Sequence, residues 1–305
     1  MAPAFRAHGW MSVVRIKSVR SVFLFLSLAA GVVPACGQTE DPLHEALSRV
    51  AREASDFWHA APTFLARETL KQKVIVTSPR DPSATQSGSD RRAPRAKDRE
   101  IVSYYGFSAY SPAPEALHEF RCIISIDGKA LLDTALAREK LRSVLDSRDD
   151  RSKRTLLGEF EKHSLGSSAI DFGQLILLFT RSNLDKYAFE VRRAALLGAD
   201  PATVIGFQQR SGPESLHISD AGKKLLSRLE GELWIRKADF AVLRISLTAV
   251  RTENKAEIRD EARVEYMPAQ GIVLPASVSY RRFVDGELRG ENIYEYSDWQ
   301  RADAR

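Results

Sequence analysis

Cysteine is scarce in this chain, which has two cysteines among 305 residues. So few cannot build a disulfide framework, so a core of buried side chains must hold the fold together. Cys122 alternates with apolar neighbours, which is typical of a small side chain buried in a strand. The sequence also lacks an apolar run of about 20 residues, the length that a membrane-spanning helix needs.

Motifs for catalysis and metal binding are missing as well. The sequence contains no Gly-x-Ser-x-Gly elbow, no His-Glu-x-x-His motif and no glycine-rich phosphate loop. The histidines beyond the N-terminal region are not at metal-ligand spacing from one another or from cysteine; they are His44, His59, His118, His163 and His217. We therefore predict a protein that is not an enzyme and has no cofactor and no metal site. A hydrolase is the least favoured alternative.

A large excess of one charge is also lacking. The whole chain has a formal net charge of +5. Residues 1–35 hold four of its 45 Lys and Arg residues and none of its 40 acidic residues, so the remainder has 41 basic and 40 acidic residues. Because the excess comes from the N-terminal residues, it gives no reason to expect nucleic-acid binding.

Those N-terminal residues have the pattern of a secretory signal peptide. Four basic residues precede an apolar run over residues 21–33, and small residues follow it. This order is the mark of export, and 13 residues are too few to span a membrane. We expect residues 1–37 to be a signal peptide. The remainder would be periplasmic or secreted, with no transmembrane span.

Cys36 lies at the end of this leader. The sequence Val33-Pro-Ala-Cys36 resembles a bacterial lipobox, whose cysteine is lipidated after cleavage, although the proline departs from the usual pattern. Lipidation of Cys36 would give a lipid-anchored lipoprotein, whereas ordinary cleavage after Ala35 or Gly37 would give a soluble one. We favour ordinary cleavage and keep Cys36 as the candidate lipidation site.

The clearest structural signal is the strict alternation of apolar and polar residues over 243–249. A period of two indicates a half-buried strand. Asp127-Gly128 and Asp285-Gly286 have the composition of two-residue hairpin turns. We predict about ten strands, namely 69–77, 101–110, 117–126, 187–193, 203–209, 216–219, 232–235, 241–250 and three more after residue 260. Short strands joined by hairpins predict an antiparallel sheet that is strongly curved or nearly closed.

Helices are predicted at two places. Asp41 and Pro42 can start a helix whose apolar residues recur every three or four positions as far as Trp58, which suits it to cover a sheet face. A helical insert over 134–181 holds two amphipathic segments and then residues 170–179, which are apolar on nearly all sides. A helix of that kind is deeply buried or plugs a cavity.

Residues 78–99 have a different composition, with proline, serine, glycine and clustered basic residues. Few of these side chains can be buried, so we predict a mobile loop between two strands. A basic patch for anionic lipid or polysaccharide is the alternative interpretation.

The chain also resembles a known group. It is similar to secreted acidobacterial proteins related to the LolA/LolB outer-membrane lipoprotein-sorting carriers. The segments that carry the resemblance are Asp171-Phe-Gly-Gln-Leu, Gly231-Glu-Leu-Trp-Ile, Phe240-Ala-Val-Leu-Arg-Ile, Val264-Glu-Tyr, Leu274-Pro and Tyr296-Ser-Asp-Trp. The resemblance spans roughly residues 42–300. It implies a half-barrel of antiparallel strands closed by helices, with an apolar cavity for acyl chains and no catalytic residue.

The predicted fold class is α+β, a strongly curved antiparallel half-barrel with helices covering or plugging its concave side, as a single domain over residues 38–305. The predicted function is binding of a lipid or a lipoprotein acyl chain in the half-barrel cavity. The alternative is a structural or protein-interaction module of the cell envelope with a filled interior and an envelope protein as partner. The predicted cavity residues are Phe120, Ile124, Leu243, Ile245, Val264, Tyr266, Val278 and Tyr280.

Overall fold

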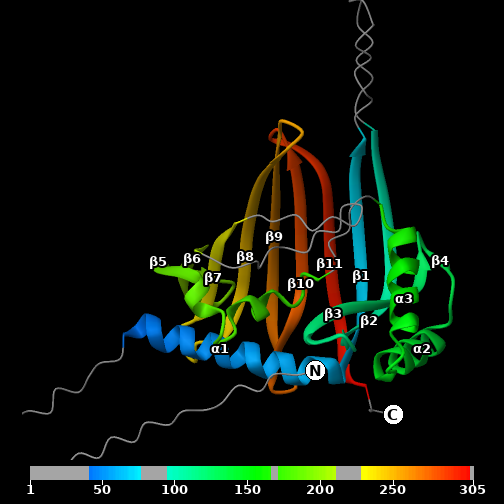
Figure 1. Ribbon diagram of the computed structural model, residues 1–305, viewed down its shortest axis with the longest axis horizontal. Coiled ribbons are helices and arrows are strands. Elements are labelled where there is room, and N and C mark those ends of the chain that lie inside the picture. The colour runs from blue at the N-terminus through cyan, green and yellow to red at the C-terminus, as the bar shows by residue number, and fades with distance from the viewer. Residues whose placement is uncertain (1–40, 77–94, 166–170, 211–227, 303–305) are drawn as a thin grey trace, which may run out of the picture. The chain divides into compact units, whose positions relative to one another are not determined.

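The computed structural model describes residues 41–76, 95–165, 171–210 and 228–302. All strands in these ranges belong to one curved antiparallel sheet, in the order β4-β3-β2-β1-β11-β10-β9-β8-β7-β6-β5 (Figure 1). The strands are β1 (Phe64–Val76), β2 (Arg95–Tyr110), β3 (Ala113–Ile126), β4 (Lys129–Ala130), β5 (Tyr187–Leu197), β6 (Asp200–Gln209), β7 (Leu229–Arg236), β8 (Val242–Glu253), β9 (Ala256–Ala269), β10 (Ile272–Val284) and β11 (Glu287–Arg301). The predicted α+β half-barrel is confirmed.

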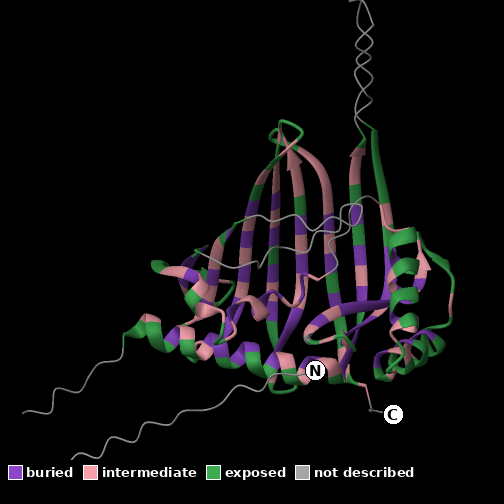
Figure 2. Ribbon diagram, viewed as in Figure 1, coloured by how far each residue is buried: buried purple, intermediate pink, exposed green. Residues whose placement is uncertain are grey.

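Alternation along the strands gives the sheet two different faces. On β8, Ile245, Leu247 and Ala249 are buried, whereas Arg244 and the other residues between them remain partly exposed. The face that carries Ile245 is called the inner face, and the face that carries Arg244 the outer face. Burial follows the middle and lower parts of the strands, and the tip of the hairpin between β8 and β9 is exposed (Figure 2).

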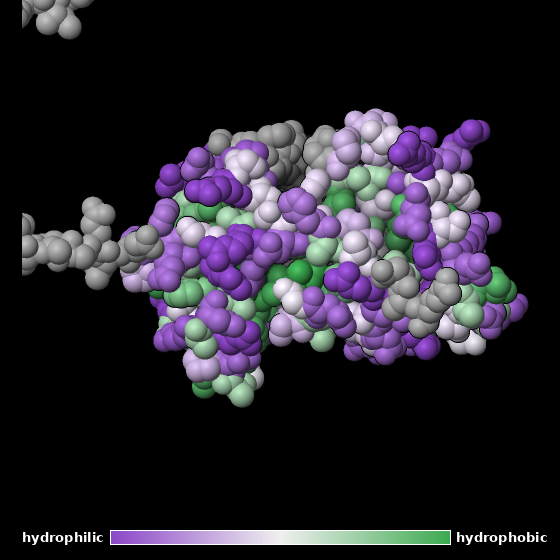
Figure 3. All heavy atoms as spheres, turned by 90° about the horizontal axis from the view of Figure 1, so that it is seen from below, coloured by the Kyte–Doolittle hydropathy of each residue, from purple (hydrophilic) through white to green (hydrophobic). Residues whose placement is uncertain are grey.

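Helix α1 (Pro42–Ala60) closes one end of the inner face (Figure 1). The side chain of Asp41 accepts a hydrogen bond from the backbone N–H of Leu43, as the predicted cap requires. One stripe of the helix is buried in the inner-face core; it consists of Ala46, Val50, Ala54 and Phe57. Seen from this end, the surface is mostly hydrophilic, with hydrophobic side chains gathered near its middle (Figure 3).

Helices α2 (Thr134–Asp146) and α3 (Asp150–His163) pack at the β2–β3 end of the sheet. Their buried apolar side chains, except Phe160 of α3, form a second core cluster with residues of the outer face. This cluster comprises Leu65, Val102, Phe120, Cys122, Ile124, Ala137, Leu141, Leu145 and Leu156. The β1–β3 end of the sheet is therefore covered on both faces.

The α-helix predicted over residues 170–179 is wrong in its type. The structure has a 3-10 helix, η2 (Leu175–Phe179), with backbone bonds of the i→i+3 kind. The N–H of Ile176 donates to the hydroxyl of Tyr266 on the sheet, so it cannot take part in the ladder of an α-helix. Burial was predicted correctly, because Leu175, Ile176 and Phe179 are all buried.

The loop predicted over residues 78–99 is too long. Residues 95–99 belong to β2 and extend its pairing with β1, with Arg95 opposite Val76 and Arg99 opposite Gln72. Most of these residues are exposed, so backbone pairing continues there without burying their charges. The rest of that loop lies outside the described residues. The predicted signal peptide, Cys36 and the predicted strand 216–219 also lie outside them.

Candidate functional site

Five of the eight predicted cavity residues lie together on the inner face. They are at most 5% exposed and pack in one cluster with α1 and η2. These residues are Ile245, Val264, Tyr266, Val278 and Tyr280. Leu243 is buried as well, at a register shift between β7 and β8. The inner face is thus apolar where the sequence indicated, and side chains of α1 and η2 pack against it.

Phe120 and Ile124 do not join this group. They belong to the cluster under α2 and α3. Arg121 follows Phe120 and reaches the inner face, where it contacts Tyr105. Because successive strand residues point to opposite faces, Phe120 points to the outer face. The structure therefore brings six of the eight residues to buried positions of β8, β9 and β10, and separates Phe120 and Ile124 from them.

Residues 171–179, here called the plug, lie against the inner face and are tied to it by hydrogen bonds. The hydroxyl of Tyr266 donates to the carbonyl of Gly173 at 3.2 Å and accepts from the N–H of Ile176 at 3.0 Å. The amide Nε2 of Gln174 donates to the carbonyl of Leu117 at 2.8 Å. A single tyrosine on β9 thus holds both the start of the plug and its 3-10 turn.

Aromatic contacts add to this attachment. The ring of Phe172 lies 4.9 Å from that of Tyr280, and the ring of Phe179 lies 4.9 Å from that of Phe207 in an edge-to-face arrangement. Such pairs contribute about 0.5–1.5 kcal/mol beyond area burial. The plug is therefore held mostly by apolar and aromatic packing, with a few hydrogen bonds that set its position.

A cluster of buried charge lies on the inner face of β1 and β3. The Nε of Arg121 donates to both carboxylate oxygens of Glu68, at 2.8 and 3.0 Å, and its Nη2 donates to Oε2 of Glu119 at 2.8 Å. All three side chains are at most 2% exposed. The guanidinium also faces the rings of Tyr105, Phe160 and Tyr294 at 4.8–5.4 Å. This triad of Glu68, Arg121 and Glu119 has two carboxylates for one guanidinium.

Glu119 is the less satisfied member of the triad. Burial raises its pKa to about 8, and the attraction of Arg121 offsets only part of that effect. Within the part of the chain that the structure describes, its Oε1 is buried without a hydrogen-bond partner, as is the hydroxyl of Tyr105. Both atoms adjoin Gly173 of the plug, because a Cβ there would lie 3.0 Å from Glu119 Oε1 and 2.6 Å from the Tyr105 hydroxyl. Glycine is therefore required at that position.

A second cluster of charge lies on β8, β9 and β10. Asp260 is fully buried, and its Oδ1 accepts hydrogen bonds from the hydroxyl of Tyr280 at 2.5 Å and from Nε of Arg282 at 2.8 Å. Its other oxygen pairs with Arg251. A cavity of about 80 Å³ borders Tyr280, Arg282 and Asn292. That is room for two or three water molecules at about 30 Å³ each.

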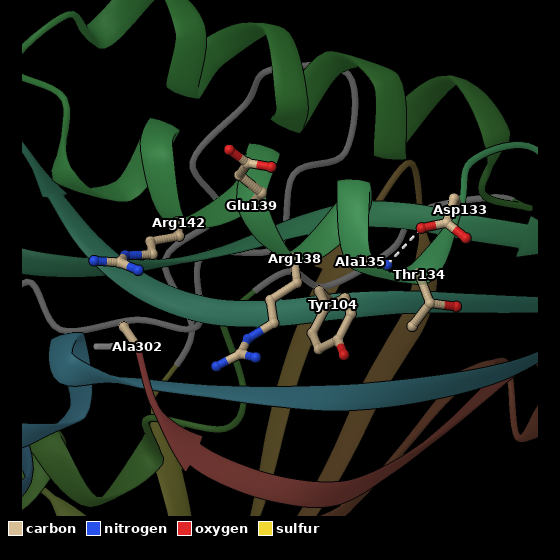
Figure 4. Close-up of a pocket in the computed structure, with 8 residues that line it drawn as sticks. All are labelled: Tyr104, Asp133, Thr134, Ala135, Arg138, Glu139, Arg142 and Ala302. Carbon is tan, nitrogen blue, oxygen red and sulfur yellow. Dashed lines mark hydrogen bonds between the residues drawn. The ribbon is translucent and has the colours of Figure 1, made fainter. Parts of the chain in front are cut away.

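The outer face carries a larger but open groove of about 580 Å³ beside α2 (Figure 4). Figure 4 shows Arg138 and Tyr104 facing this groove, with Asp133 capping the helix through the N–H of Ala135. Farther along this face, Trp234 lies between the guanidinium groups of Arg193 and Arg244. The outer face is thus polar around β7 and β8, and Trp234 packs between charged side chains there.

Within the described ranges, no three His, Cys, Asp or Glu side chains are placed to hold a metal ion. In the same part of the chain, no helix is long and apolar enough to cross a membrane. The Nδ1 of His118 lies 3.2 Å from a carboxylate oxygen of Asp171, which also accepts the N–H of Glu119 and so anchors the start of the plug.

Sequence reasoning missed the buried triad. Charged strand residues usually face solvent, so the sequence suggests that Glu68, Glu119 and Arg121 are exposed. One signal was available, because Glu119 and Arg121 are two apart and Arg121 stands alone within an otherwise apolar run. Residues two apart on a strand lie on the same face of the sheet. Opposite charges at such positions can pair and be buried together.

No protein-family model and no curated protein matches the chain. Three solved chains are similar to it. A DUF1329 family protein from Desulfovibrio piger has a TM-score of 0.36 at 10% identity, with 87% of this chain and 95% of that chain covered. An outer membrane lipoprotein-sorting protein domain from Vibrio parahaemolyticus has a TM-score of 0.34 at 8% identity, with 86% and 94% covered. At these TM-scores the matches carry no argument about function.

Proposed function

We propose that the protein is an exported, non-catalytic binding protein of the cell envelope. Its ligand is an apolar chain, either a lipid or the acyl chain of a lipoprotein, held against the inner face. The observation that carries the proposal is that a separate apolar segment, the plug, packs against that face. A segment of this kind can be exchanged for a ligand of similar chemistry.

The energetics of such an exchange are close to balanced. Leu175, Ile176 and Phe179 bury their side chains in the inner-face core. An acyl chain that took their place would contribute about 0.8 kcal/mol for each buried CH₂ group. Tyr266 would release its two bonds to the plug at a net cost of about 0.5–1.5 kcal/mol each. The gain from a long chain is therefore of the same order as the cost of exposing the plug and breaking these bonds.

A second candidate function is a structural or interaction module of the envelope with an envelope protein as partner. The observation that favours it is the packing of the inner face, since the predicted cavity residues there are buried and the neighbouring cavity is only about 80 Å³. In that case the plug is a permanent part of the core. The two candidates differ in whether the plug can leave.

The test compares two tyrosine variants of the protein from residue 38 onwards. Tyr266→Phe removes both hydrogen bonds to the plug, whereas Tyr104→Phe alters a tyrosine beside the outer groove and is the matched control. We expect Tyr266→Phe to bind the apolar dye N-phenyl-1-naphthylamine about five- to tenfold more tightly, because each 1.4 kcal/mol is a factor of ten. The control should bind it as the wild type does.

Native mass spectrometry of the same proteins, purified from bacteria, gives a second readout. We expect co-purified lipid in the wild type and more of it in Tyr266→Phe. Protein free of lipid in every preparation, together with dye binding that Tyr266→Phe leaves unchanged, would contradict the carrier function and favour the filled module.

A further inference from the structure

The proposed function leaves open what the polar end of the ligand contacts, and the inference below rests on that function. Two buried polar atoms under the plug, Oε1 of Glu119 and the hydroxyl of Tyr105, have no hydrogen-bond partner among the described residues. Buried polar groups are almost always paired, so each unpaired one calls for an explanation. Here two occur side by side, on the face that the plug covers.

Both atoms adjoin the same point of the plug. They lie within 3.0 Å of the position that a Cβ of Gly173 would occupy. The carbonyl of Gly173 is turned to Tyr266, so it serves neither atom. When the plug leaves, the position of Gly173 becomes a small space next to one carboxyl oxygen and one phenol hydroxyl. A ligand that fills the apolar part of the plug site would have its end near them.

The charges around this space determine which kind of polar end group the ligand can have. Arg121 already donates from Nε to Glu68 and from Nη2 to Glu119. Glu68 and Glu119, which remain on the sheet when the plug leaves, outnumber that guanidinium. A carboxylate entering the space would meet acidic groups and lose its hydration, both of which disfavour it.

We propose that Glu119 and Tyr105 bind the polar end of the acyl ligand, and that this end is an uncharged hydroxyl or amide group rather than a carboxylate. Such a group both donates and accepts hydrogen bonds, and so can pair with a carboxyl oxygen and a phenol hydroxyl together. The inner face thereby selects neutral amphiphiles over free fatty acids, while its apolar part accepts the hydrocarbon chain of either class of ligand.

The experiment measures displacement of N-phenyl-1-naphthylamine from the protein by palmitamide, hexadecanol and palmitate, which share one chain length. We expect the amide and the alcohol to displace the dye at concentrations at least tenfold below that of palmitate. Tyr105→Phe removes a hydroxyl that has no partner among the described residues, so it should fold normally and reduce the preference to about threefold or less. Tyr104→Phe on the outer face should keep the full preference.

Glu119→Met provides a second variant, which leaves Arg121 paired with Glu68 and removes the unpaired oxygen. It should also abolish most of the preference. Equal displacement by all three ligands in the wild type, or an undiminished preference in both variants, would overturn the inference while leaving chain binding in place. Failure of all three ligands to displace the dye would overturn the proposed function itself.

Discussion

The two clusters of buried charge on the inner face are built from similar groups in different proportions. In the cluster of Asp260, one carboxylate is surrounded by Tyr280, Arg282 and Arg251, and both of its oxygens have partners. In the triad, two carboxylates share Arg121, and one oxygen of Glu119 is left over. The carboxylate of Asp260 is fully paired and holds strands together, whereas that of Glu119 keeps one oxygen that can bind a ligand.

Removing the fully paired carboxylate, that of Asp260, should have the largest effect on stability. Asp260→Ala leaves Arg251 and Arg282 without the buried anion between them, and breaking a buried ion pair in this way costs about 3–5 kcal/mol. Urea unfolding of the variant and the wild type measures the difference. A loss below about 1 kcal/mol would show that this cluster does not support the β8–β10 region.

Glu119 in the triad should instead make stability depend on pH. The pKa of Glu119 is raised from 4.5 to about 8 by burial, so the folded protein binds a proton more tightly than the unfolded chain. The contribution of protonated Glu119 to the free energy of unfolding is therefore fully present below about pH 4.5 and is lost as the pH rises to about 8. The loss is on the order of a few kcal/mol, because each unit of pKa difference is about 1.4 kcal/mol.

Glu119→Gln isolates that effect, since glutamine cannot ionise. Glu53 also has a pKa raised by burial and contributes in the same direction, so the informative quantity is the difference between wild type and variant. We expect the wild type to lose stability relative to Glu119→Gln between pH 5 and pH 8, as followed by urea unfolding at each pH. A constant difference across that range would contradict the raised pKa.

The smallest effect should come from the outer face, where ion pairs are open to solvent. Glu265 accepts a hydrogen bond from Nε of Arg244 at 2.7 Å, and both side chains are partly exposed. Exposed pairs contribute about 0–1 kcal/mol, so Glu265→Ala should lower the free energy of unfolding by no more than that. A loss as large as that of Asp260→Ala would mean that the exposed ion pair contributes as much to stability as the buried one, which contradicts the comparison.

The fold could be predicted from local patterns because those patterns act over short distances. The alternation over residues 243–249 became the two faces of β8, and both Asp-Gly pairs became turns in which each residue has a positive φ. The composition of residues 170–179 correctly indicated burial. It could not indicate the 3-10 form, because that depends on the hydroxyl of Tyr266, which lies far away in the sequence.

The candidate site could be predicted only in its apolar part. Alternation identified Ile245, Val264 and Val278 as inward, because apolar side chains mark the buried face directly. The triad depends on the register that sets β1 beside β2 and β2 beside β3, which brings Glu68 and Arg121 together across two strand pairings. Phe120 and Ile124 were assigned to the predicted cavity because the sequence does not reveal that α2 buries part of the outer face as well.

Hydrogen exchange of residues 171–179 with and without palmitamide tests most directly whether a ligand replaces the plug. We expect the ligand to speed exchange at the amides of the plug, above all that of Ile176, which donates to Tyr266 in the unliganded structure. The strands β8–β10 should stay protected. Ligand binding that leaves exchange in the plug unchanged or slower would contradict the claim that an apolar chain takes the place of the plug on the inner face.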